Sequence, residues 1–74
     1  MLMNNLNVAK IQLNGSAFEI NTGTNLNELL NNLKIQKNKV AIEVNGVIVD
    51  KNKYSNMVLN KDDKVEIVHF IGGG

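Results

Sequence analysis

Residues 8–20, VAKIQLNGSAFEI, contain the clearest pattern in the sequence and predict two paired strands with a turn between them. Apolar and polar residues alternate before and after the turn, which is typical of strands buried on one face. Asn14-Gly15 supplies the positive φ angles that a two-residue hairpin turn needs. The residues expected to face inward are Ala9, Ile11, Leu13, Phe18 and Ile20.

A helix is predicted after the turn at residues 22–24. Asn25 is a good N-cap, and Glu28, three positions later, can bond back to its amide as in a capping box. Apolar residues then recur at helical spacing and form one stripe, made by Leu26, Leu29, Leu30 and Leu33. The opposite face is rich in asparagine, a mediocre helix former, so we expect this helix to depend on packing against a sheet.

Three more strands are predicted in the second half of the chain. Residues 40–44 alternate around Val40, Ile42 and Val44, and Asn45-Gly46 predicts a second tight turn before the short apolar run at 47–49. One helical turn is expected at 53–56. The last strand is predicted at 64–70, with Val65 and Ile67 on one face and Glu66, Val68 and Phe70 on the other.

This order of elements favours an α+β fold, a mixed sheet of four to five strands with one main α-helix. The first and last strands can pair in parallel at the centre, because the helix lies between them in sequence. That is the ubiquitin-like β-grasp arrangement. The chain has 74 residues, so we expect a single domain over residues 1–74 with a flexible glycine tail at 72–74.

The composition argues against several functions. Eight basic and seven acidic residues give a net charge of +1, which does not favour a nucleic-acid or membrane partner. The chain has no cysteine, one histidine (His69) and one tyrosine (Tyr54). We therefore expect no bound metal or cofactor, and no enzyme, since few groups for acid–base or nucleophilic catalysis are present. The sequence shows neither a membrane span nor a signal peptide, which favours a cytoplasmic location.

The unusual feature is the ending Ile71-Gly72-Gly73-Gly74, directly after the last predicted strand. Without side chains, such a tail can thread a narrow channel and bring the carboxylate of Gly74 into another protein's active site. A carboxylate is a poor electrophile, so acyl transfer from it requires activation, usually adenylation by ATP. The alternative is a frayed end without function.

In these features the sequence resembles the ubiquitin-like sulfur carrier proteins, and within them the ThiS family of thiamine biosynthesis. The resemblance covers roughly residues 8–74. It depends on four segments in this order: IQLNG at 11–15, NLNELL at 25–30, VAIEVNGVIV at 40–49 and KVEIVHFIGGG at 64–74.

The resemblance implies a function for the tail. In this family an adenylating enzyme of the ThiF type activates the C-terminal carboxylate with ATP, and sulfur from a cysteine desulfurase relay replaces AMP. Thiazole synthase (ThiG) then takes sulfur from the resulting thiocarboxylate into the thiazole of thiamine. On this chain Gly74 is the implied site of adenylation and thiocarboxylation, Gly73 completes the glycine pair, and Gly72 is an extra spacer. The chain itself would be a protein co-substrate and not a catalyst.

The chain differs from the family pattern after the second turn. Where the family often has Val-Pro-Arg and then Trp, this sequence has Val49-Asp50-Lys51 and then Tyr54. We expect Tyr54 to pack over the sheet edge in place of the larger aromatic residue.

A docking surface is expected beside the tail, on the sheet face that the helix leaves open. An exposed apolar patch next to a reactive end suits the binding of partner enzymes. The residues predicted for it are Ala41, Glu43, Val68, Phe70, Ile71 and Gly72.

Two other functions stay open at this point. The small subunit of molybdopterin synthase shares the fold and the Gly-Gly end, but that family tends to have prolines near the last strand, and this chain has none. A ubiquitin-like modifier or interaction domain would use the same sheet face without sulfur chemistry.

Overall fold

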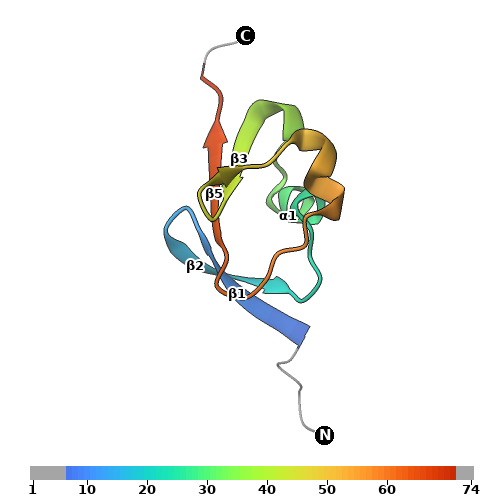
Figure 1. Ribbon diagram of the computed structural model, residues 1–74, viewed down its shortest axis with the longest axis vertical. Coiled ribbons are helices and arrows are strands. Elements are labelled where there is room, and N and C mark those ends of the chain that lie inside the picture. The colour runs from blue at the N-terminus through green and yellow to red at the C-terminus, as the bar shows by residue number, and fades with distance from the viewer. Residues whose placement is uncertain (1–6, 72–74) are drawn as a thin grey trace, which may run out of the picture.

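The computed structural model describes residues 7–71, which form a five-stranded mixed sheet with helix α1 packed against one face (Figure 1). This confirms the α+β, β-grasp prediction. Across the sheet the strands follow the order β2-β1-β5-β3-β4. Along the chain the elements are β1 (Val8–Leu13), β2 (Ser16–Asn21), α1 (Leu26–Leu33), the short 3-10 helix η2 (Lys37–Lys39), β3 (Val40–Val44), β4 (Val47–Ile48), a second 3-10 helix η3 (Lys51–Asn56) and β5 (Lys64–His69).

Both predicted hairpins are present. Strands β1 and β2 pair antiparallel around Asn14 and Gly15, whose φ angles are 48° and 84°. Strands β3 and β4 pair in the same way around Asn45 and Gly46, with φ angles of 53° and 84°. Asparagine and glycine tolerate this left-handed backbone, and it matches the twist of the flanking strands.

Strand β5 lies at the centre of the sheet, between the two hairpins. It is parallel to β1, where Val65 lies beside Leu13, and antiparallel to β3, where Ile67 lies beside Ile42. The last strand of the chain therefore joins the two halves of the domain, and the C-terminal tail continues from the most central element.

Helix α1 begins with the predicted capping box. The Glu28 amide donates to the Asn25 side chain at 2.9 Å, and the Asn25 amide donates to the Glu28 carboxylate at 3.0 Å. The helix ends at Lys34, which has a left-handed backbone with φ of 59°. Its predicted apolar stripe faces the sheet, with Leu26, Leu29 and Leu30 buried and Leu33 half-buried. No helix among the described residues is long and apolar enough to cross a membrane.

The core lies between the sheet and α1, and it also includes Tyr54 from η3. This 3-10 helix is longer than the single turn predicted at residues 53–56. Tyr54, which was predicted to pack over the sheet edge, has no exposed surface and belongs to the hydrophobic core. Its hydroxyl is buried and has no hydrogen-bond partner in residues 7–71.

The asparagine side chains of both hairpin turns hold β5 in place. The Asn14 amide group donates to the carbonyl of Ile67 at 3.1 Å and accepts from the Ile67 amide at 2.7 Å. The Asn45 side chain accepts from the Lys64 amide at 2.9 Å and donates to the Asp63 carboxylate at 3.0 Å. These contacts extend the pairing of β5 beyond its backbone ladder.

Candidate functional site

The candidate site is the end of β5, where the chain leaves the sheet. The Phe70 amide donates to the carbonyl of Lys39 at 2.9 Å, one residue beyond the strand. Ile71 is 99% exposed. In Figure 1 the arrow of β5 points away from β1 and β2. The predicted reactive residues Gly72, Gly73 and Gly74 lie outside the described residues.

The structure brings the predicted docking residues of the sheet together on one face. Ala41 lies directly opposite Val68, and Glu43 opposite Glu66, on the neighbouring strands β3 and β5. Directly opposite residues share a face, and their sequence neighbours Ile42 and Ile67 are buried under α1, so these four side chains lie on the outer face. Val68 and Phe70 are 55% and 57% exposed.

Ile48 belongs to the same face, although the sequence analysis did not include it. It lies opposite Glu43 on the edge strand β4 and is 68% exposed. The sequence did contain the signal: a two-residue turn at Asn45-Gly46 places residue 47 opposite 44 and residue 48 opposite 43. We call the set formed by Ala41, Glu43, Ile48, Glu66, Val68 and Phe70 the outer patch.

The outer patch combines apolar side chains with two uncompensated carboxylates. Glu43 and Glu66 face each other across β3 and β5, and in residues 7–71 neither forms an ion pair or a hydrogen bond through its side chain. Directly opposed like charges destabilise a sheet by about 0.2–1 kcal/mol.

The ring of Phe70, at the edge of this patch nearest the tail, contacts a lysine from η3. The Lys51 ammonium lies 5.3 Å from the centre of the ring, a cation–π distance. The same ammonium donates to the carbonyl of Val40 at 2.8 Å. Lys51, the first residue of η3, thus contacts both Val40, the first residue of β3, and Phe70, the residue that follows β5.

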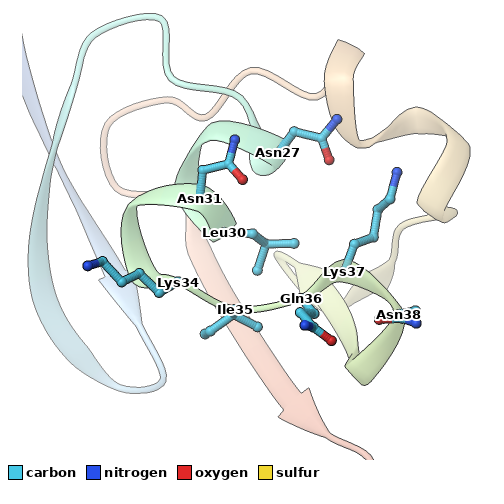
Figure 2. Close-up of a pocket in the computed structure, with 8 residues that line it drawn as sticks. All are labelled: Asn27, Leu30, Asn31, Lys34, Ile35, Gln36, Lys37 and Asn38. Atoms are coloured by element: carbon cyan, nitrogen blue, oxygen red, sulfur yellow. The ribbon is translucent and has the colours of Figure 1, made fainter.

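The described residues also contain a groove of about 720 Å³ between α1 and η2 (Figure 2). Its lining has amide, lysine and apolar side chains but no carboxylate, imidazole or hydroxyl: Asn27, Leu30, Asn31, Lys34, Ile35, Gln36, Lys37 and Asn38. His69 is exposed at the end of β5. No group of His, Cys, Asp or Glu in residues 7–71 is arranged to hold a metal ion.

A β-grasp domain whose central strand leads into a glycine tail, with an open apolar face beside it, defines the class of ubiquitin-like carriers and modifiers. Within that class, the model of the ThiS family matches residues 11–74. The chain therefore belongs to the ThiS family, the small sulfur carrier proteins of thiamine biosynthesis.

Individual relatives agree with this assignment. The sulfur carrier protein ThiS of Bacillus subtilis is 38% identical over 66 residues, which cover 86% of this chain and 98% of that protein. The crystal structure of the thiamine biosynthesis protein ThiS from Geobacter metallireducens superposes with a TM-score of 0.77 at 29% identity, covering 88% of this chain and 99% of that one.

A second kind of relative is a much longer protein. A thiazole synthase of Magnetococcus marinus is 46% identical over 65 residues, which cover 88% of this chain. The matched region is only 20% of that protein, so the chain spans about a fifth of the length of this relative.

Proposed function

We propose that this chain carries sulfur as a thiocarboxylate on Gly74 and donates it for thiazole formation in thiamine biosynthesis. The observation that supports this best is the position of the tail in a member of the ThiS family: three glycines follow the central strand β5, immediately after the fully exposed Ile71. Glycines have no side chain to obstruct a narrow active-site channel.

The proposed chemistry has two steps. A carboxylate oxygen of Gly74 attacks the α-phosphorus of ATP, which releases pyrophosphate and leaves an acyl adenylate. In the second step the outer sulfur of a persulfide on a cysteine desulfurase relay attacks the carbonyl carbon and displaces AMP, and a thiol then cleaves the resulting acyl disulfide, which leaves a disulfide on the relay. The product is the thiocarboxylate. The chain supplies no catalytic group, and ATP is the substrate of a ThiF-type adenylating enzyme and not a cofactor of this protein.

The outer patch is the proposed docking surface for the partner enzymes, with Ile71 and Gly72 continuing it toward the reactive end. Its apolar side chains provide area to bury, and its position beside the end of β5 places a bound partner next to the tail. Its two carboxylates favour a partner with arginine or lysine at the matching position.

Thiazole synthase (ThiG) is the proposed acceptor of the sulfur. The support comes from the longer relative named thiazole synthase, of which a fifth resembles this chain. Two modules in one polypeptide meet at high effective concentration, which is useful where one passes a group to the other.

The test is the intact mass of the untagged protein after co-expression with a ThiF-type enzyme and a cysteine desulfurase. We expect a mass increase equal to the difference between a sulfur and an oxygen atom, and no increase in a variant that lacks Gly73 and Gly74. The circular dichroism spectrum of the truncated variant should match that of the full chain, since the core lies in residues before the tail.

Two outcomes would contradict the proposal. One is an unchanged mass although the adenylating enzyme is active on another carrier. The other is the appearance of isopeptide conjugates to lysines, which would favour the modifier function instead.

A further inference from the structure

The Lys51 side chain lies beside β3 at a point where no neighbouring strand pairs with it on that side. The carbonyl of Ile42 accepts the Val49 amide on the β4 side of β3. Val40, two residues earlier, presents its carbonyl to the same side because strand residues alternate with period two. Strand β4 has only two residues and ends before it reaches Val40. The Lys51 side chain takes the place of the missing strand and donates to the Val40 carbonyl at 2.8 Å.

This hydrogen bond fixes the ammonium where it also meets the chain end. Lys51 is half-buried, and its Nζ lies 5.3 Å from the centre of the Phe70 ring. Phe70 makes the backbone hydrogen bond beyond β5, to Lys39, and the next residue, Ile71, is almost completely exposed. Phe70 is thus the last described residue that a backbone hydrogen bond holds at the end of β5.

From this geometry we infer that Lys51 is a positioning residue for the C-terminal tail. By holding the Phe70 ring near the start of β3, it fixes the direction in which the chain leaves the sheet at Ile71. Part of the entropy cost of ordering this end is then met before a partner binds. The inference rests on the proposed function, since it concerns how the tail reaches the active site of the adenylating enzyme.

A positioning role and a purely structural role give different kinetic results. If Lys51 orders the tail before binding, its loss destabilises the ground state and the transition state of the enzyme complex by the same free energy. KM then rises while kcat is unchanged. If Lys51 only satisfies the Val40 carbonyl, its loss lowers thermal stability and leaves both kinetic constants unchanged.

The decisive variant is Lys51→Met, which keeps the apolar stem but removes the charge and the hydrogen-bond donor. With the adenylating enzyme and ATP, we expect the KM for this variant to be about two- to fivefold higher, as the strength of an exposed cation–π contact implies. Lys51→Arg should restore the wild-type KM. The matched control is Lys53→Met in the same 3-10 helix, whose exposed side chain makes no such contact and whose KM should be unchanged.

A double-mutant cycle with Phe70→Leu tests whether the effect passes through the ring. Phe70 belongs to the outer patch, so its own substitution is expected to raise KM. In that background Lys51→Met should add almost nothing. Independent effects of the two substitutions, or an unchanged KM for Lys51→Met alone, would overturn the inference.

Amide relaxation in the isolated protein provides a readout that does not depend on the enzyme. We expect the order parameters of Phe70 and Ile71 to fall in Lys51→Met and to be unchanged in Lys53→Met. If the wild-type chain is not adenylated at all, the proposed function fails, and this measurement still decides whether Lys51 orders the end of β5. Unchanged order parameters would overturn the inference even where adenylation is normal.

Discussion

Glu43 and Glu66 lie directly opposite each other on β3 and β5, with no basic partner among the described residues. Opposed like charges on neighbouring strands repel, so this pair lowers the stability of the fold. Under the proposed docking role of the outer patch, a positively charged partner surface compensates this repulsion. Removal of either carboxylate is then expected to raise the free energy of unfolding and to weaken partner binding.

The first prediction follows from that opposition. Glu43→Gln and Glu66→Gln should each raise the free energy of unfolding by about 0.2–1 kcal/mol, since each removes the repulsion. Each should also weaken binding to the adenylating enzyme, measured as Kd by calorimetry without ATP. The weakening should shrink as salt is added, because salt screens the attraction that the substitution removes.

The matched control is Glu19→Gln in β2. Glu19 faces Lys10 across the β1–β2 hairpin and lies outside the outer patch. This substitution removes a favourable charge neighbour, so stability should be unchanged or slightly lower, and the Kd should be unchanged. A gain in both stability and affinity for the Glu43 and Glu66 variants would contradict the assigned role of the pair.

The second prediction concerns the Tyr54 hydroxyl, which is buried and finds no hydrogen-bond partner in the part of the chain that the structure describes. Tyr54→Phe removes the unsatisfied group and keeps the ring, so the free energy of unfolding should rise by about 1 kcal/mol. Tyr54→Ala should instead lower it by about 3–5 kcal/mol, because a large core side chain is lost. Urea denaturation checks both values. Destabilisation of Tyr54→Phe by more than about 1 kcal/mol would mean that the hydroxyl is satisfied after all.

The third prediction is a loss of stability at high pH. Burial raises the pKa of Tyr54 above its ordinary value near 10. Above about pH 10 the unfolded chain loses the phenolic proton while the folded chain keeps it, so the folded state is progressively disfavoured. The difference in free energy of unfolding between wild type and Tyr54→Phe should therefore be constant below that pH. Above it, the wild type should become progressively less stable relative to the variant.

This titration can be followed directly. Tyr54 is the only tyrosine and the chain has no tryptophan, so phenolate absorbance reports a single group. The folded protein should titrate at a higher pH than the protein in urea. Identical titration curves in the two states would contradict the prediction.

The fourth prediction tests the side-chain bridge between Asn14 and Ile67. Asn14→Gly keeps the left-handed turn but removes both side-chain hydrogen bonds, of 2.7 and 3.1 Å. The free energy of unfolding should fall by about 1–3 kcal/mol, as expected for two partly buried hydrogen bonds. Asp62→Gly is the control, since Asp62 also has a left-handed backbone but its side chain makes no hydrogen bond to any of the described residues. Equal effects of the two substitutions would mean that Asn14 acts only through the turn.

Local patterns in the sequence were sufficient to predict most of the elements. The Asn-Gly pairs at 14–15 and 45–46 determined both hairpins and their registers, because few residues adopt positive φ angles without strain. Asn25 and Glu28 predicted the start of α1, and the leucine spacing predicted its buried face. The resemblance of four short segments to the ThiS family was also evident, and the family comparison confirmed it.

The sequence alone determined the two hairpins and the capped helix, because each depends on residues close together in the chain. Only the tertiary structure decided what the contacts between distant residues would be. It paired Glu43 with Glu66, placed Lys51 against Val40 and Phe70, and turned the hairpin asparagines into supports for β5. The physical reason is that these residues are far apart in the sequence and come into contact only when the strands and the 3-10 helix η3 pack together, which local sequence patterns do not specify.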